Sequence, residues 1–258
     1  MAATNDTSFL ERNRGCSEVV KHVNGIRERG FAANPYPCIG LYRFANLTLP
    51  THPLYDTIVE RLKATDTDET TYLDVGCCFG QDLRQLVHDG VPSDRLIGLD
   101  IAGVLMELGY DFFHDRETLE SKFVVADVFK GPEQGSVWTQ LQERGVDVMH
   151  CSAFFHLFTL EEQVAAAKHL AGLVKRGGII VGRQIGSVKP GNVPAIKEQS
   201  FSYRHDVNTF EAMWREVGEA TQTRWKVEGT MDMIGINTNS PVEDENSRRF
   251  LFTVTRIE

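Results

Sequence analysis

Two histidines and a serine lie within the seven-residue span from His150 to His156, in the segment MHCSAFFHLF. A histidine near an acceptor hydroxyl can act as a general base, and a nearby serine hydroxyl can hold the acceptor. The same residues are also typical of a buried, hydrogen-bonded histidine (His150) and of a residue packed beside a helix start (His156). We treat His150 and His156 as candidate catalytic residues and Ser152 as a candidate substrate contact.

Three arginines could hold an anionic acceptor. Arg183 follows the apolar stretch IIVG, where a charge is costly without a partner, whereas Arg43 lies between Tyr42 and Phe44, and Arg204 lies in FSYRHD. A guanidinium binds a carboxylate through two parallel hydrogen bonds, and a carboxylic acid is already ionised at neutral pH. A phenol, with a pKa of about 10, needs a general base. Arg183 is therefore the third catalytic candidate, and a carboxylate and a phenol both stay open as acceptors.

Aromatic residues gather in the proline-rich segment 34–53 and after the fourth expected strand. Aromatic side chains are more often core than ligand contacts, but together they could wall an apolar acceptor site. The segment 186–206 is long for a bare connector and is a candidate lid or dimer element. The candidate substrate contacts are Tyr36, Tyr42, Arg43, Phe44, Ser152, Phe155, Gln184 and Arg204, with Phe154 and Phe201 as further candidates for the wall.

Short apolar strands alternate with amphipathic helices from residue 71 onward. This alternation predicts parallel βαβ units and an α/β fold with a Rossmann-like, doubly wound sheet. A capping box of Thr159 and Glu162 should begin a helix that ends at Gly177. Residues 1–34 are ambiguous, and 34–53 should form an irregular, packed loop. Strands are expected at 71–76, 95–100, 122–127, 146–151, 179–184, 223–233 and 248–257, and helices at 54–64, 81–90, 102–115, 159–177 and 206–218.

The turn DVGCCFGQD joins the first strand to a helix, at the end of the sheet where open α/β folds bind ligands. Gly76 and Gly80 allow the backbone to approach a ligand closely. Asp100 ends the second strand, where a carboxylate can accept hydrogen bonds from both ribose hydroxyls, and Asp127 ends the third, where it can meet an adenine edge. Asp74, inside the first strand, needs donors such as a ligand ammonium group or backbone amides. Together these residues predict a nucleoside pocket.

The predicted nucleoside should carry no pyrophosphate. A dinucleotide site needs G-x-G-x-x-G, whereas Cys77, Cys78 and Phe79 stand between the two glycines here, and Asp82 in the first helical turn would repel phosphate. S-adenosylmethionine has ribose and adenine without a diphosphate and fits this pattern. A nicotinamide oxidoreductase is the rival on the same architecture, and the absence of an obvious Y-x-x-x-K pair also counts against it. A non-catalytic protein that binds the cofactor is a third alternative.

Composition is ordinary for a soluble globular protein, with 41% hydrophobic and 24% charged residues among 258. The net charge of −9 disfavours nucleic acid and anionic membrane surfaces as partners, so we expect a small-molecule acceptor. The sequence shows no secretory signal, membrane-spanning stretch or metal-ligand cluster, and its five cysteines form no C-x-x-C pair. We expect a cytoplasmic protein that uses no metal, and we leave a homodimer open.

Five segments also carry a family likeness: LDVGCCFGQD, IGLDI, ADVF, MHCSAFFHLF and LVKRGGIIVGRQ resemble, in order, the motifs of class I S-adenosylmethionine-dependent methyltransferases. A narrower likeness includes YPCIGLYRFANLTLPTHPLYDTIV and the doubled cysteine. There the sequence is similar to the small O-methyltransferases of fungal meroterpenoid biosynthesis, which typically esterify a carboxyl group of a polyketide-derived or farnesylated intermediate. The resemblance implies a cap at residues 1–50 and a methyltransferase domain at 51–258.

The resemblance also implies a seven-stranded sheet of order 3-2-1-4-5-7-6 with the last strand antiparallel. Gly76 and Gly80 would pass under the methionine portion of the cofactor. Asp100 would hold the ribose, and the second glycine of the family motif would lie near Cys78, where this sequence departs from the pattern. The expected cofactor contacts are Asp74, Gly76, Cys77, Cys78, Gly80, Asp100, Ile101 on the adenine face, Asp127 with Val128 at the adenine, and Cys151.

Overall fold

The computed structural model describes residues 14–64, 70–130, 137–195, 200–238 and 243–258. Its main feature is a seven-stranded sheet of order β3-β2-β1-β4-β5-β9-β8. The strands are β1 (Tyr72–Val75), β2 (Leu96–Asp100), β3 (Lys122–Val125), β4 (Val146–His150), β5 (Val174–Ser187), β8 (Trp225–Asp232) and β9 (Ser247–Arg256).

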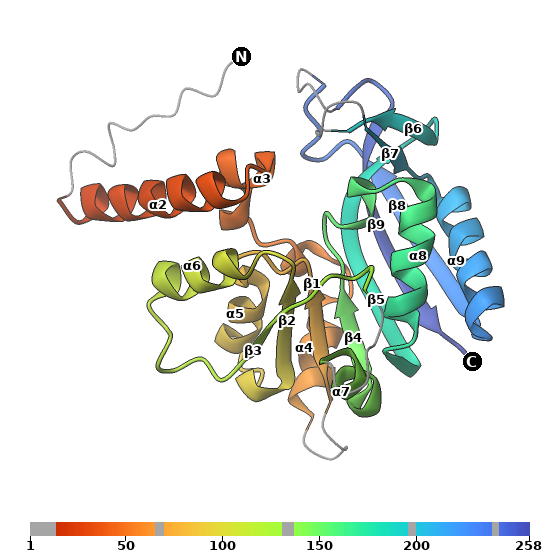
Figure 1. Cartoon of the computed structure of the whole chain (residues 1–258), viewed down its shortest axis with the longest axis horizontal. Helices are drawn as coiled ribbons and strands as arrows, with labels where there is room; N and C mark the ends of the chain where they lie inside the picture. Colours follow the sequence, from red (N-terminus) through yellow and green to blue (C-terminus); the bar gives the residue numbers. More distant parts are fainter. Residues whose placement is uncertain (1–13, 65–69, 131–136, 196–199, 239–242) are drawn as a thin grey trace.

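Strands β1 to β5 pair in parallel, and β9 runs antiparallel to both of its neighbours, β5 and β8. Counted along the chain within this sheet, the order is 3-2-1-4-5-7-6, so the expected topology is confirmed. The carboxyl ends of the parallel strands lie at one edge, toward the top of Figure 1.

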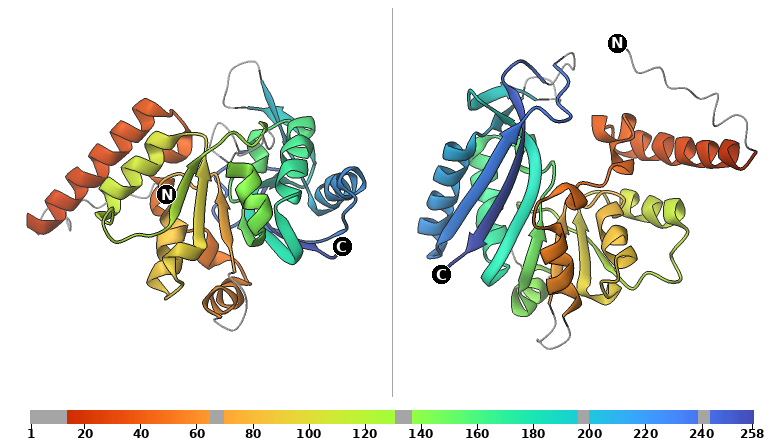
Figure 2. Two further views of the ribbon diagram at one scale, coloured as in Figure 1. Left: turned by 60° about the horizontal axis from the view of Figure 1, so that its bottom comes forward. Right: turned by 180° about the vertical axis from the view of Figure 1, so that it is seen from behind.

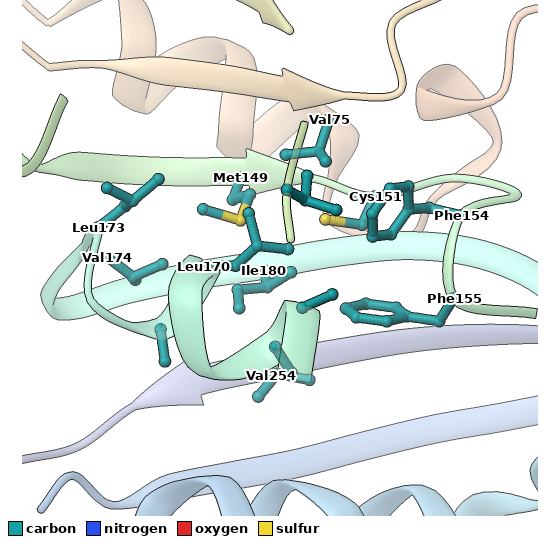
Figure 3. Packing of buried hydrophobic residues seen from close by; sticks show 14 of the residues in the cluster. Val75, Met149, Cys151, Phe154, Phe155, Leu170, Leu173, Val174, Ile180 and Val254 are labelled. Carbon is teal, nitrogen blue, oxygen red and sulfur yellow. The ribbon is translucent and has the colours of Figure 1, made fainter. Parts of the chain in front are cut away.

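Helices cover both faces of the sheet (Figures 1 and 2). One face carries α4 (Tyr55–Lys63), α5 (Gln81–His88) and α6 (Gly103–Phe113), and the other carries α7 (Val137–Arg144), α8 (Leu160–Ala171) and α9 (Val207–Thr221). Strand residues alternate between the two cores, because successive side chains leave opposite faces of a strand. Leu73 and Val75 enter the α8 side, shown in Figure 3, whereas Tyr72 enters the α4 and α5 side.

Two expected element boundaries need correction. The helix after Thr159 ends at Ala171 and not at Gly177, because Val174 already pairs with Val146 and begins β5. Strand β5 is therefore longer at both ends than the IIVGRQ segment from which it was expected. The capping box itself is confirmed: the Glu162 N–H donates to Thr159 Oγ1, and the Thr159 N–H donates to Glu162 Oε2.

The N-terminal segment is more regular than expected. It contains α2 (Arg14–Ala33), α3 (Pro37–Gly40) and the 3-10 turns η1 (Arg43–Ala45) and η2 (Leu49–Thr51). Two further 3-10 turns, η3 (Ser93–Arg95) and η4 (Phe155–Leu157), lie in the sheet domain. Helix α2 lies along α6. None of the helices that the structure describes is long and apolar enough to cross a membrane.

Phe79 fastens this N-terminal segment to the sheet. Its side chain is fully buried and leaves the glycine turn to enter a separate apolar cluster with Ile26, Ile39 and Phe44. The rings of Phe44 and Phe79 lie 4.7 Å apart between centroids. A bulky residue in the turn thus serves as the anchor for the chain that precedes it.

The segment 186–206, expected as a lid or dimer element, contains a small hairpin. Strands β6 (Gly191–Pro194) and β7 (Phe201–Arg204) pair antiparallel and form a sheet of their own. The hairpin and α3 both lie at the edge of the main sheet where the parallel strands end (Figure 1). Its role as a lid or a dimer contact stays a prediction.

We predict that Phe79→Ala lowers the free energy of unfolding by about 3–5 kcal/mol, because it leaves a cavity between the N-terminal segment and α6. Urea denaturation measures this loss, and limited proteolysis should show earlier cleavage within α2. Phe31→Ala is the control, since it removes the same aromatic ring from α2 itself at a position that is 41% exposed. An equal loss in both variants would contradict the anchoring role of Phe79.

Candidate active site

The turn after β1 has an unusual backbone. Gly76, Cys78 and Gly80 all have positive φ, at 75°, 54° and 69°. A Cβ at Gly80 would also lie 2.7 Å from the Phe123 ring, so no larger residue fits there. Cys78 occupies a conformation that favours glycine, which costs a non-glycine residue roughly 1–2 kcal/mol. The chain therefore follows a glycine-type path even where the sequence departs from the glycine pattern.

Asp100 joins the end of β2 to this turn. Its Oδ2 accepts a hydrogen bond from the Cys78 N–H at 2.9 Å, and its Oδ1 accepts one from the Ala102 N–H at 2.9 Å. Burial raises the pKa of Asp100, and the backbone donors oppose this shift. Each carboxylate oxygen keeps a second lone pair, so two further donors, such as a pair of vicinal hydroxyls, can bind the same group.

The neighbouring strand end offers a flat apolar surface. Ile101, just after β2, is 66% exposed, and Val125, at the end of β3, is 65% exposed. Asp127 lies next to them and accepts a hydrogen bond from the Phe129 N–H at 3.0 Å. Val128 is buried within the α8 side core. Exposed aliphatic groups beside a carboxylate are suited to an aromatic ring with a polar edge.

The three cysteines near the turn are chemically inert. Cys77 and Cys151 are fully buried, and Cys151 lies in the core between Met149 and Phe154 in Figure 3. Cys78 packs against the apolar cluster around Phe79. Burial raises the pKa of all three thiols well above its usual range, so they stay protonated and uncharged.

Asp74 and His150 form a buried pair beneath the strand ends. They occupy partner positions on β1 and β4, and the His150 Nδ1 lies 3.0 Å from Asp74 Oδ1. Burial raises the pKa of Asp74; for His150 burial has the opposite tendency, but the Asp74 charge leaves its pKa raised. The Ser152 hydroxyl lies 2.7 Å from His150 Nε2, and the Arg183 N–H donates to Ser152 Oγ at 3.2 Å. The donors that Asp74 requires are thus supplied by this histidine.

The N-terminal segment reaches the same chain of hydrogen bonds through Thr48 and Asp82, a link that the sequence did not reveal. Asp82 accepts hydrogen bonds from the N–H groups of Thr48 and Leu49, at 2.9 and 3.1 Å, and from the Thr48 hydroxyl at 2.8 Å. Thr48 Oγ1 also lies 3.4 Å from His150 Nε2. The signal for this link in the sequence was Asp82 itself, because a carboxylate that becomes buried needs hydrogen-bond donors.

Asp74, Asp82 and His150 bring three ligand-type atoms within 4.8 Å of one another. Each of the three residues has a protein partner in the described structure, since His150 binds Asp74 and Asp82 binds Thr48 and Leu49. We therefore assign no metal to it.

Arg183 and Gln184 leave opposite faces of β5. Alternation puts Arg183 with Val181 and His150 on the α4 side, and Gln184 on the other side with Ile180. No hydrogen bond or ion pair of the Arg183 guanidinium occurs among the residues that the structure describes. Both polar atoms of the Gln184 side chain are also buried without a partner in the described ranges. Two separate groups near the strand end are thus available to a ligand.

His156, in η4, is held neutral by its surroundings. Its Nδ1 is buried and has no hydrogen-bond partner among the described residues. Burial lowers the pKa of His156 to about 3, and the positive charges of Arg204, Arg183 and Arg43 add to the shift. At neutral pH this histidine is therefore uncharged and a very weak base.

Arg43 and Arg204 approach the same region from different segments. Arg43, in η1, lies 3.5 Å from Glu243, a buried carboxylate in the segment between β8 and β9. Arg204, in β7, donates to Ser247 Oγ at 2.7 Å. The cluster therefore contains the three expected arginines and the buried Glu243, to which the sequence analysis gave no role.

The aromatic candidates divide into core and surface groups. Phe155 is fully buried against Phe210 and Trp214 in the α8 side core, and Phe154 lies beside it (Figure 3). Phe44 packs on Phe79. The remaining candidates are partly or largely exposed: Tyr36, Tyr42 and Phe201.

Comparisons with known proteins return methyltransferases. Residues 15–45 match the family described as "Meroterpenoid methyltransferase N-terminal domain", and residues 73–178 match "Methyltransferase domain". "O-methyltransferase phiE" of a fungal species is 34% identical over 254 residues, covering 92% of this chain and 83% of its own. "Asnovolin E/Chermesin D methyltransferase nvfJ" of Aspergillus novofumigatus is 36% identical over 214 residues, covering 82% of this chain and 74% of its own.

Two solved structures share the fold at low sequence identity. The Haemonchus contortus "Phospholethanolamine N-methyltransferase 2" has a TM-score of 0.53 and 12% identity, covering 78% of this chain and 52% of its own. A "putative S-adenosylmethionine dependent methyltransferase" from Listeria monocytogenes has a TM-score of 0.50 and 12% identity, covering 78% of this chain and 97% of its own. These likenesses concern the fold alone.

We predict that His150→Leu lowers the free energy of unfolding by about 3–5 kcal/mol, because it leaves the Asp74 carboxylate buried without its partner. The double variant Asp74→Leu/His150→Leu should lose clearly less than the sum of the two single variants, since no buried charge is left alone. Urea denaturation of the four proteins measures the coupling. Strict additivity would mean that the two side chains do not depend on each other.

The buried His156 predicts a pH dependence of stability. Its pKa is lower in the folded protein, about 3, than the usual 6.5, so the unfolded state binds more protons between these values. Its contribution to stability is complete above pH 6.5 and is lost as the pH falls toward 3. His156→Gln should therefore flatten the fall of unfolding free energy below pH 6.5, by up to about 1.4 kcal/mol per pH unit. The exposed His88→Gln is the control, and an equal slope in all three proteins would contradict the assignment.

Proposed function

Because the chain belongs to the S-adenosylmethionine-dependent methyltransferases, in the family of these fungal O-methyltransferases, we propose that it transfers a methyl group to the carboxylate of an apolar intermediate. The family relation carries the enzyme class and the cofactor. The proposal about the acceptor is our own, and it rests on the charges at the ends of β4 and β5. We further propose that the acceptor is a polyketide or meroterpenoid acid of secondary metabolism.

The residues at the glycine turn suit the cofactor. Asp100 keeps lone pairs for the two ribose hydroxyls, and Ile101 and Val125 offer exposed aliphatic groups to the adenine ring. Asp127 would meet the adenine edge. Gly76 and Gly80 would bring the backbone close to the methionine portion. Asp74, Cys77 and Cys151, which are fully buried, would support the site from below and not touch the ligand.

The observation that carries the acceptor proposal is the Arg183 guanidinium, which has no hydrogen bond or ion pair within the described part of the chain. A charge on a half-buried strand position is costly without a partner, and a substrate carboxylate would supply one. His156, with a pKa of about 3, is too weak a base to deprotonate a phenol at neutral pH. A carboxylate needs no base, so arginines beside a neutral histidine suit an acid better than a phenol.

The protein's task in such a reaction is alignment. The cofactor would supply an electrophilic methyl group on a sulfonium centre, and the residues of this chain would hold an anionic acceptor oxygen in line with the bond between that methyl and sulfur. Ser152, which is held by His150 and by the Arg183 N–H, would form part of the acceptor side of the site. Arg183 would orient the carboxylate, and the described N-terminal residues 14–50 would cap the site and exclude water, whereas residues 1–13 of the expected cap lie outside the described residues. Tyr36, Tyr42 and Phe201 would then contact the apolar body of the acceptor.

A phenolic acceptor is the second candidate, and one observation favours it. The chain from Asp74 through His150 to Ser152 could accept a proton from a phenol that binds at the Ser152 hydroxyl. His150, unlike His156, has a raised pKa because of Asp74. This candidate predicts a methyl ether as product, and its activity would rise with pH.

We predict that a prenylated 2,4-dihydroxybenzoic acid, which offers a carboxyl group and two phenols, receives its labelled methyl on the carboxyl group. Alkaline hydrolysis releases the label from an ester and leaves it on an ether, so the product identifies the acceptor. Activity should be independent of pH above the pKa of the acid. A methyl ether, or a rise of activity through the histidine range, would overturn the carboxylate proposal.

Arg183→Met should raise the KM for this acid by roughly 10- to 100-fold, as expected for the loss of a charged hydrogen-bond pair. Arg176→Met is the matched control, because Arg176 lies on the same strand but is exposed. S-adenosylhomocysteine binding, measured by calorimetry, should be equal in both variants. A KM for Arg183→Met equal to that of the control would remove Arg183 from the acceptor site.

A further inference from the structure

Glu243 is a buried carboxylate within the cluster of arginines. Its side chain is only 1% exposed, although it belongs to the polar segment between β8 and β9. One oxygen accepts a hydrogen bond from the Asn237 N–H at 2.5 Å, and the other lies 3.5 Å from Arg43 Nη2. The contact between Arg43 and Glu243 thus joins the N-terminal segment to the segment between β8 and β9, 200 residues away in the sequence.

The charge of Glu243 acts on Arg183 and Arg204 as well as on Arg43. Burial lowers the pKa of Arg183 and of Arg204, and Glu243 is among the acidic groups that oppose this shift in both. The same three arginines lower the pKa of His156, so all five side chains share one region. Glu243 is therefore a negative charge that the protein itself supplies at the place proposed for the acceptor carboxylate.

The contact with Arg43 is weak enough to be exchanged. It consists of a single approach at 3.5 Å, and the Arg43 side chain is 37% exposed. By contrast, Arg84 binds Asp115 through two hydrogen bonds of 2.6 and 2.9 Å and is nearly buried. When Arg43 turns to a second carboxylate, the buried Glu243 is not left alone, because it keeps the hydrogen bond from the Asn237 N–H and its interaction with the charges of Arg183 and Arg204.

We propose that Glu243 is a resident counter-ion that holds Arg43 until an acceptor carboxylate takes its place, and that it thereby selects anionic acceptors. This inference rests on the proposed carboxylate function. A neutral group gains nothing by displacing a carboxylate from a guanidinium, whereas an anion restores the pair that it breaks. Glu243 acts here as a specificity-determining residue.

Methyl transfer to the acceptor would reverse this exchange of partners at Arg43. An electron pair of the acceptor carboxylate forms the bond to the methyl carbon, and the bond between that carbon and sulfur breaks with its pair left on sulfur. No proton moves, and the ester product is neutral. Arg43 has then lost its anionic partner, and Glu243 can bind it again, which favours release of the ester.

The test is the variant Glu243→Gln, whose amide oxygen can still accept the Asn237 N–H. With the prenylated 2,4-dihydroxybenzoic acid as probe, the KM should fall about fivefold while kcat stays within twofold, because the competing charge is gone. Glu245→Gln is the matched control: it makes the same change of charge two residues away at an exposed site, and its KM should equal that of the parent protein.

A double-mutant cycle with Arg43→Gln completes the test. In that background Glu243→Gln should change the KM clearly less than in the parent protein, because the Arg43 guanidinium that Glu243 contacts is gone and only its longer-range effect on Arg183 and Arg204 remains. If Glu243 only fastens the loop, its removal raises the KM or lowers the melting temperature, and the proposal is wrong. An ester product with an unchanged KM in Glu243→Gln would overturn this inference alone, whereas an ether product would overturn the proposed function together with it.

Discussion

The buried Asp74 carboxylate is the constraint on which the rest of the site depends. A charge under the ends of a parallel sheet requires a partner from the sheet itself, because water does not reach it. The parallel register of β1 and β4 supplies His150 at the position beside it. From His150 the hydrogen bonds continue to Ser152 and to the backbone of Arg183, so one buried charge orients the side of the site proposed for the acceptor.

The N-terminal segment is attached to this arrangement at two points of different chemistry. Phe79 gives it an apolar anchor, and Asp82 gives it three hydrogen bonds through Thr48 and Leu49. Both residues belong to the glycine turn or to the first turn of α5. The turn proposed to hold the cofactor is therefore also the structure that positions the N-terminal segment.

The charged side chains on the proposed acceptor side of the site are arranged differently from the Asp74–His150 pair. Arg43, Arg183 and Arg204 come from η1, β5 and β7, and His156 stays neutral among them. Their mutual repulsion is tolerated because Glu243 and a solvent-facing edge reduce it. Such a cluster is unfavourable for stability on its own, which is typical of groups kept for a ligand.

The local pattern of this sequence determined the α/β alternation, the helix start at Thr159 and the strand end at Asp100, since these depend on neighbours along the chain, whereas the third strand ends at Val125, two residues before the expected Asp127. The order of the strands followed from the family resemblance, and the structure agrees with it. What the tertiary structure decided were the contacts between distant segments. The register of the parallel strands brings His150 to Asp74, and the loop between β8 and β9 brings Glu243 to Arg43. Phe79 packs into the cluster that holds the N-terminal segment. The neighbours of these residues in the sequence give no sign of their partners, because the partners come from distant segments.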